Sequence, residues 1–366
     1  MPVAADAQVL TNVPSTPFMP NPPQFDALSQ RNHHVVVPAL ADPGDGAWTA
    51  QVPIPQAGIL SGLWIHFTGT LTLTGGGSSA STKANRWPHG LINTVEFSTN
   101  FNQQIISATG PDLHVHRWVT NPSMPVGGME LAPSAGTVLS VPGAFPVSFS
   151  LFVPIAADKA SLIGALYAQS AANLLTLRIR RNPLLDCWTV AGGGTLALTG
   201  TYAIATDFFD IPRDPATGAV ITPDIRRLHG FSAMDVPLAA TGQQKILLPP
   251  QNGNLLRLFM RITSPTGDFN PDPDANSGWT KLTLHYGSNK NPQEWDLASL
   301  INRNVDHYGA QPPYNYVILD FLRENPVRDA VVLDGLTDLA VLVDIASGTS
   351  IPANTMIHIV QETLYN

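Results

Sequence analysis

His114 and His116 have the spacing that most directly suggests metal chemistry in this chain. They lie in the segment LHVHRW (113–118), where an extended strand would place both imidazoles on one face. Two imidazoles at this spacing can bind zinc when a third ligand joins them. We favour the simpler interpretation that they are polar residues at a subunit contact. A second pair, His33 and His34, has no acidic or cysteine partner nearby in the sequence.

The loop at 264–278 (SPTGDFNPDPDANSG) holds the best candidates for binding a cation. Its aspartates, Asp268, Asp272 and Asp274, offer hard oxygen ligands of the kind that hold calcium. The loop lacks the ligand order and the distal glutamate of an EF-hand, and an exposed acidic loop stiffened by prolines is the simpler interpretation. We therefore predict no bound metal, name these aspartates as the only candidates, and expect no cofactor and no catalytic or cofactor-binding residue.

Carboxylates and tryptophans are the remaining groups that could act on a glycan. Glu294 and Asp296 could serve as a hydrolytic pair, although acidic residues so placed are more typical of a helix start, where they favour the helix dipole. A sugar-binding platform could be built from Trp64, Trp87, Trp118, Trp188, Trp279 and Trp295. Most of these are expected to anchor a core or an interface instead. Because no nucleotide-binding, serine-hydrolase or zinc-protease motif occurs, we predict a protein that is not an enzyme.

Charge and cysteine content exclude several kinds of partner and site. The 366-residue chain has a net charge of −8 and 13% charged residues, without the basic stripe that grips nucleic acid. Cys187 is the only cysteine, so neither an intrachain disulfide nor a cysteine-based zinc site can form. The N-terminal segment lacks the regions of a signal peptide, and no stretch approaches the roughly 18 apolar residues of a membrane helix. We expect a soluble protein made in the cytosol.

The elements that must position these residues are short strands, and their pattern runs through the chain twice. In the first, Leu63, Ile65 and Phe67 alternate with polar residues, a period of two that is typical of a half-buried strand. The first set of such segments is 62–74, 90–99, 146–155, 173–181 and 201–211. The second set, in the same order, is 254–263, 279–288, 314–323, 338–346 and 355–364. The pattern predicts two tandem β-sandwiches of one plan.

Proline-rich segments divide these strands into domains. Residues 1–34 show no periodicity and are interpreted as an extended N-terminal arm. The segment 212–229 combines prolines, aspartates and a glycine and is interpreted as a linker. These boundaries predict one sandwich at 35–211 and a second at 230–366.

Short helices are expected between some of the strands. The apolar spacing of 158–173 and of 294–309 is that of short amphipathic helices. The segment 323–338 is expected to be partly helical. Helices are therefore predicted to be a minority, inserted into a β fold.

Longer phrases of the sequence resemble a known family. FVPIAADKASLIGALYAQSAANLLTLRI (152–179) joins a strand ending in VP, a short acidic entry, a helix that contains GA and a further strand. Its companion block is GILSGLWIHFTGTLTLT (58–74) with WPHGLINTVEFSTNFNQQIISATGPDLHVHRWVTN (87–121), in which ATGPDLH could open a helix. Both blocks resemble the N-terminal jelly roll of the major capsid proteins of tectivirus-type bacteriophages, which are tailless, icosahedral, double-stranded-DNA phages with an internal membrane. The similarity covers most of 48–211 and is looser over 230–366.

The resemblance implies an all-β fold of two tandem eight-stranded jelly rolls with short inserted helices. It implies a structural protein of the virion, synthesised in the host cytoplasm, which forms homotrimers of pseudo-hexagonal outline. These trimers would tile an icosahedral shell with penton and minor capsid proteins around an internal membrane, without sequence-specific binding of nucleic acid. The alternatives are a carbohydrate- or receptor-binding two-sandwich protein and, less favoured, a glycan hydrolase with carboxylates converging between the halves.

Overall fold

The computed structural model describes most of the chain beyond the N-terminal segment. The described residues are 25, 28–83, 87–99, 103–121, 132, 137–158, 161–169, 174–223, 227–249, 253–265, 268–271, 278–286, 293–322, 330–334, 336 and 338–365. Most of the predicted arm at 1–34 therefore lies outside the described residues. Its last four residues begin the first strand.

The first jelly roll is formed by two four-stranded layers. One layer has the order β1 (Arg31–Ala41), β12 (Thr195–Phe209), β3 (Ile59–Thr74) and β8 (Gly143–Pro154), and β9 (Leu166–Tyr167) also pairs with β3. The other has the order β6 (Gln103–Ala108), β5 (Ile92–Thr99), β10 (Leu175–Arg181) and β2 (Val52–Ile54). A small third sheet joins β11 (Trp188–Ala191), β4 (Ser79–Thr82) and β7 (Val138–Leu139). A one-turn helix, α3 (Leu184–Cys187), precedes β11.

The second jelly roll has the same construction. Its first layer has the order β18 (Val317–Asp320), β15 (Asn254–Thr263), β21 (Met356–Tyr365) and β13 (Leu228–Pro237), and β19 (Val331–Val332) also pairs with β15. Its second layer has the order β14 (Gly242–Leu247), β20 (Leu339–Ile345), β16 (Trp279–Tyr286) and β17 (Gln293–Asp296). The predicted pair of tandem eight-stranded jelly rolls is confirmed.

The repeat inferred from strand order holds strand by strand. The central strand β3 pairs with β8 and β12 in the first jelly roll, as β15 pairs with β18 and β21 in the second. The opposite layers match in the same way, because β2–β10–β5–β6 corresponds to β14–β20–β16–β17. The short extra strand of each jelly roll also recurs in the same place, because β9 pairs with β3 and β19 pairs with β15. All ten segments that the sequence marked as strands contain one.

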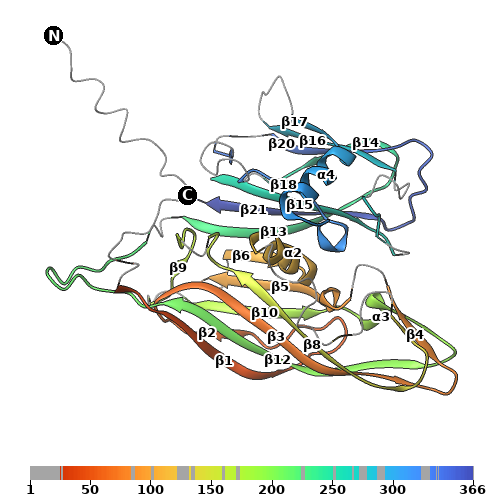
Figure 1. Cartoon of the computed structure of the whole chain (residues 1–366), viewed down its shortest axis with the longest axis horizontal. Helices are drawn as coiled ribbons and strands as arrows, with labels where there is room; N and C mark the ends of the chain where they lie inside the picture. Colours follow the sequence, from red (N-terminus) through yellow and green to blue (C-terminus); the bar gives the residue numbers. More distant parts are fainter. Residues whose placement is uncertain are drawn as a thin grey trace, which may run out of the picture.

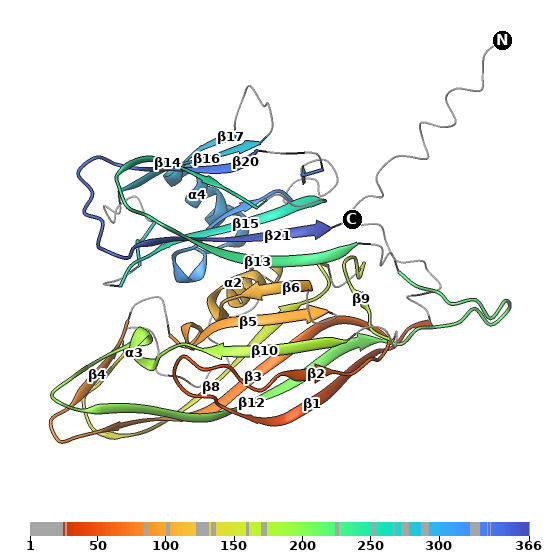
Figure 2. The same cartoon turned by 180° about the vertical axis from the view of Figure 1, so that it is seen from behind.

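One parallel contact fuses the two jelly rolls into a continuous sheet. In β13, Phe231 and Ser232 pair with Ile106 and Ser107 of β6. The result is a nine-stranded sheet that belongs to both halves. Figures 1 and 2 show the second jelly roll lying along the first, with β13 next to β6 and helix α2 beside them.

The two longer helices occupy equivalent places in the repeat. Helix α2 (Gly110–Thr120) follows β6, and α4 (Leu297–Tyr308) follows β17. A capping box between Thr109 and Asp112, with proline in the first turn, starts α2. The Asp296 side chain caps α4 by accepting from the backbone of Ser299. The helix predicted at 294–309 and the helix start at ATGPDLH are confirmed, so the extended arrangement considered for His114 and His116 is wrong.

The helix expected at 158–173 is not formed in its described part. Residues 161–169 make turns and the short strand β9. Leu162 has a φ of 56° and Gly164 a φ of 82°, which interrupts any right-handed helix. A Cβ at Gly164 would lie 2.6 Å from the Cβ of His229, so this turn packs closely against the start of β13. The segment 323–338 lies largely outside the described residues, and its described part holds β19.

The apolar core divides along the same plan. One cluster fills the first jelly roll and a second cluster fills the second. Strand β21 is buried on both faces: Ile357 and Ile359 belong to the second core, whereas Val360 belongs to the first. This double burial places the polar residues of β21 between the two jelly rolls. None of the described helices combines the length and the apolar character needed to cross a membrane.

Candidate functional site: the polar interface between the jelly rolls

Helix α2 inserts polar side chains between the two jelly rolls. Asp112, His114 and His116 are all buried, at 0%, 5% and 2% exposure. They face strands β13, β15 and β21 of the second jelly roll, and the turn at Tyr314, through hydrogen bonds and ring contacts. We call this region the inter-roll interface. Its polar members are Asp112, His114, His116, His229, Arg257, Arg261, Tyr316, His358 and Glu362.

His358 bridges two carboxylates at one end of the inter-roll interface. Its Nε2 lies 2.9 Å from Asp112 of α2, and its Nδ1 lies 2.6 Å from Asp235 of β13. Both partners of the ring are carboxylates, so both ring nitrogens donate and the imidazole is positively charged. Burial opposes this charge, but the charge of Asp112 and the two hydrogen bonds raise the pKa of His358 to about 9.

Asp112 is held ionised in the same cluster. Burial by itself would raise its pKa, but the charge and hydrogen bond of His358, the charge of Arg261 and the hydrogen bond from the Tyr316 hydroxyl hold it far below the usual range. The guanidinium of Arg261 lies 5.0 Å from the centre of the Tyr316 ring. The cluster therefore joins α2 of the first jelly roll to three strands of the second through charges that compensate one another.

Glu362 is the centre of a second buried cluster. One of its carboxylate oxygens lies 3.2 Å from Nε2 of His116 and 3.2 Å from Nε2 of His229. Nη1 of Arg257 lies 3.0–3.1 Å from both oxygens, and Nε of Arg257 lies 3.1 Å from Asp320. Burial would raise the pKa of Glu362, but the Arg257 charge and the two imidazoles hold it well below its usual range. The carboxylate is therefore ionised and surrounded by nitrogen atoms.

His114 lies in a third, uncharged group. Its ring stacks on that of His89 with centroids 4.0 Å apart, and both rings meet the Tyr314 ring edge-on. Burial, and then the proximity of His89 and Arg117, hold the pKa of His114 well below its ordinary value. His114 is therefore neutral and takes part in packing. The structure thus separates the predicted pair, because His114 and His116 enter different clusters.

Of the three aspartates named as cation candidates, only Asp268 is among the described residues. Asp268 lines a cavity of about 170 Å³ with Asp235, Arg261 and His358, at the edge of the inter-roll interface. Asp272 and Asp274 lie outside the described residues, so the expectation that this loop binds no metal stays a prediction. His33 has an acidic partner that is distant in the sequence, because its Nδ1 lies 2.8 Å from Oδ1 of Asp207.

The carboxylates and tryptophans considered for glycan chemistry have structural places. Asp296 caps α4, and Glu294 pairs with Lys281 at 2.6 Å. Four of the tryptophans are buried: Trp87, Trp118, Trp188 and Trp279. Trp64 is covered by the Arg117 guanidinium, 4.8 Å from its ring centre.

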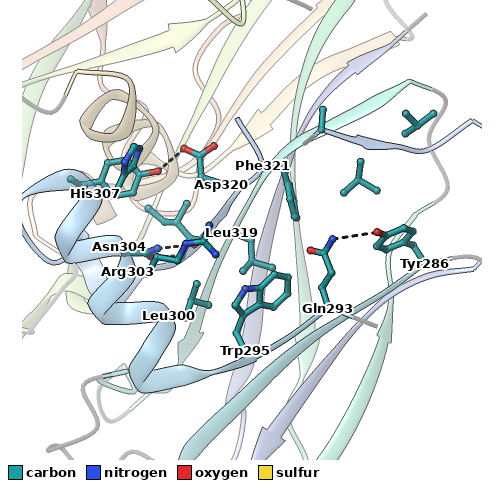
Figure 3. Close-up of a pocket in the computed structure, with 15 residues that line it drawn as sticks. Tyr286, Gln293, Trp295, Leu300, Arg303, Asn304, His307, Leu319, Asp320 and Phe321 are labelled. Carbon is teal, nitrogen blue, oxygen red and sulfur yellow. Dashed lines mark hydrogen bonds between the residues drawn. The ribbon is translucent and has the colours of Figure 1, made fainter. Parts of the chain in front are cut away.

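Trp295 lines a cavity of about 450 Å³ that lies beside α4 (Figure 3). Gln293 donates to the Tyr286 hydroxyl at 3.3 Å, and the Tyr308 hydroxyl donates to Asp320 at 2.6 Å. Asp320 is the only carboxylate among the described residues that line this cavity. The paired carboxylates of a retaining or inverting glycosidase are therefore not assembled in it.

Comparison with solved structures identifies the architecture. No family model and no curated protein matches the sequence. The structure is similar to the crystal structure of the STIV MCP, with a TM-score of 0.69 and 14% identity over 92% of this chain and 97% of that one. It is also similar to a chain of Sulfolobus Turreted Icosahedral Virus (TM-score 0.65, 15% identity, 92% and 90% covered). A third similar structure is PBCV-1 VP54 fitted into the virophage Sputnik (TM-score 0.56, 11% identity, 92% and 93% covered).

These matches define the class of protein by its fold. The chain has the double jelly-roll fold, and the resemblance inferred from its sequence is confirmed at the level of the fold.

The sequence alone did not predict which residues meet at the inter-roll interface. His229 and Glu362 are 133 residues apart in the chain, and Glu362 is 246 residues from His116. A glutamate inside the apolar strand at 355–364 was the one available hint, because a strand buried on both faces rarely carries an unpaired charge.

Proposed function

We propose that this protein is a major capsid protein that assembles as homotrimers into the icosahedral shell of a virus. Its neighbours in the shell would be other trimers, penton proteins and minor capsid proteins. The shell would surround an internal membrane, as in the tectivirus-type phages that the sequence resembles. The role is structural and non-enzymatic, and it does not involve sequence-specific binding of nucleic acid.

The observation that carries this proposal is the strand-by-strand repeat. Each chain presents two jelly rolls of one plan, lying along each other and joined by the pairing of β6 with β13. Three such chains around a threefold axis place six similar sandwiches in a ring. The resulting trimer has a nearly hexagonal outline, which packs in a shell while its closed symmetry fixes the subunit number.

The composition and the similar structures support the same role. Only 13% of the residues are charged, a low share that suits a protein whose surface is largely covered by neighbouring subunits. One of the similar structures is that of the PBCV-1 virus capsid (TM-score 0.54, 12% identity). A chain of this fold with this composition is best explained as a shell subunit.

The native mass of the purified protein tests the proposed trimer. Multi-angle light scattering should give a stable species near three times the chain mass of 39.1 kDa, independent of dilution over the micromolar range. The capsid proposal would be refuted if the protein stayed monomeric at all concentrations and bound glycans. Concentrated protein viewed by electron microscopy should form closed shells or sheets of hexagonally packed particles.

The proposed arm is tested by deletion. Residues 31–34 belong to β1, and Arg31 and His33 both contact Asp207, so a deletion through residue 34 would damage the sandwich itself. We therefore choose a deletion of residues 1–24, which leaves β1 complete. Trimers should persist while shell assembly is impaired. Loss of the trimer would contradict the arm role.

A further inference from the structure

The ligand set His116, His229 and Glu362 has the composition of a zinc site. Each residue offers one ligand atom, and the three atoms lie within 4.8 Å of one another. Two histidines and a glutamate are a ligand combination used by zinc proteins. All three side chains are buried, at 2%, 0% and 0% exposure, and they come from α2, β13 and β21.

The distances distinguish this cluster from the proton-bridged one nearby. His358 lies 2.9 and 2.6 Å from its two carboxylates, as charge-assisted hydrogen bonds do. Both imidazoles of the Glu362 cluster stand off from the carboxylate oxygen at 3.2 Å. A tetrahedron with metal–ligand bonds of about 2.0–2.1 Å has edges of about 3.3 Å. Two of the three ligand–ligand distances in the Glu362 cluster, those from Oε1 to the two imidazoles, are close to this edge length.

The hydrogen bonding of His229 prepares its ring for a metal. Its Nδ1 lies 3.0 Å from the carbonyl oxygen of Pro154, which can only accept, so Nδ1 carries a proton. Nε2 faces the Glu362 carboxylate, so either a proton or a metal ion has to lie between these two acceptor atoms. Histidine ligands of metals commonly donate their other ring nitrogen to a backbone carbonyl in this way.

The charges of Arg257, Asp320 and Glu362 sum to a net negative charge, which favours the binding of a cation. Arg257 binds Glu362, but its own charge is offset by Asp320 at 3.1 Å. Glu362 thus brings a negative charge that this ion pair does not cancel. His116 Nδ1 has no hydrogen-bond partner among the described residues, so no contact fixes the proton on either nitrogen of that ring.

We propose that His116, His229 and Glu362 bind one divalent transition-metal ion of the zinc class. The ion would connect α2 of the first jelly roll with β13 and β21 of the second, and a water molecule would complete its coordination. Because the three ligands are shielded from solvent, the ion would bind during folding and would stabilise the inter-roll interface.

Metal content and cobalt spectroscopy test the site on the full-length protein. The protein is expressed in zinc-supplemented medium and analysed by mass spectrometry of metals, and a second sample is refolded with Co²⁺. We expect about one zinc per chain and the intense visible bands of tetrahedral cobalt with nitrogen and oxygen ligands. His229→Gln should lose the ion and the bands, whereas His34→Gln, which changes an exposed histidine on β1, should keep both.

Each outcome decides the proposal, including the case in which His229→Gln does not fold. Wild-type protein that contains no zinc and gives no cobalt spectrum after refolding would overturn it without reference to any variant. Equal metal content in wild type and in soluble His229→Gln would also overturn it, because the ion would then lie elsewhere. Removal of the ion by a chelator should lower the melting temperature of the wild type and of His34→Gln alike.

Discussion

The charged His358 should make the stability of this protein fall as the pH rises from neutral to alkaline. The pKa of His358 is raised from 6.5 to about 9, so the folded chain holds one more proton than the unfolded chain between these values. A group of this kind contributes its full stability below pH 6.5 and loses it as the pH passes the folded pKa. At about 1.4 kcal/mol per pKa unit, the shift corresponds to about 3 kcal/mol.

The groups that face His358 fix the sign of this effect. Asp112 of α2 and Asp235 of β13 accept its hydrogen bonds, while Arg261 of β15 opposes its charge and Tyr316 packs nearby. Deprotonation above pH 9 leaves two carboxylates without the cation between them. The pKa of Asp112 and of Asp235 is lowered, so both stay ionised throughout the alkaline range and add no opposing slope.

The assay is urea unfolding followed by tryptophan fluorescence at constant ionic strength from pH 6 to 10. The free energy of unfolding of the wild type should fall by about 3 kcal/mol between pH 6.5 and 9. His358→Gln should be less stable at pH 6.5 by roughly 3–5 kcal/mol, because a buried carboxylate loses its charged partner, and its pH slope should be nearly flat. His34→Gln should retain the wild-type slope. Equal slopes in the wild type and His358→Gln would refute the reasoning.

Four further substitutions probe the packing around the repeat, each measured by the same unfolding assay. Gly253→Ala should cost about 3 kcal/mol or more, because Gly253 has a φ of 115° and a Cβ would lie 1.8 Å from the Leu364 carbonyl oxygen. Gly218→Ala, at a φ of 70° with open space around it, should cost only about 1 kcal/mol; equal losses would show that the clash is relieved. Asn304→Ala should cost about 2–4 kcal/mol, since its amide satisfies a backbone N–H and a carbonyl of β18 at 3.0 Å each, and a loss below about 1 kcal/mol would mean that water replaces it. Thr109→Ala removes the cap of α2 and should cost about 1 kcal/mol, with no change of the alkaline slope.

The architecture was predictable because its signal is local. Alternation such as that of Leu63, Ile65 and Phe67 reports a buried face directly, and all three are fully buried in β3. The order of such strands suggested the repeat, and the longer phrases that resemble a known family made it specific. The helix expected at 158–173 failed because Leu162 and Ile163 are buried from a turn and Leu166 from strand β9, and an apolar spacing does not distinguish these from a helical stripe.

The inter-roll interface was only partly predictable, for a different physical reason. The spacing of His114 and His116 suggested a shared strand face, whereas the segment is a helix that starts at the capping box of Thr109, and the two rings contact different neighbours. The partners of His116 come from β13 and β21, which reach α2 only through the tertiary fold. No local pattern records such contacts, so the clusters emerge only when the second sheet is placed against the first.

The central position of β21 sets an order for the synthesis of the chain. Every strand of the first jelly roll has been made once residue 209 is complete, so that half can fold while translation continues. The second half differs, because β21 separates β15 from β13 in its sheet and is the last described strand in the sequence. Until β21 has been synthesised, the edges of β13 and β15 that pair with it are open. Asp112 and His116 of α2 also lack their hydrogen-bond partners on β21, which are His358 and Glu362. The nascent chain therefore cannot complete the sheet of its second jelly roll until β21 is in place.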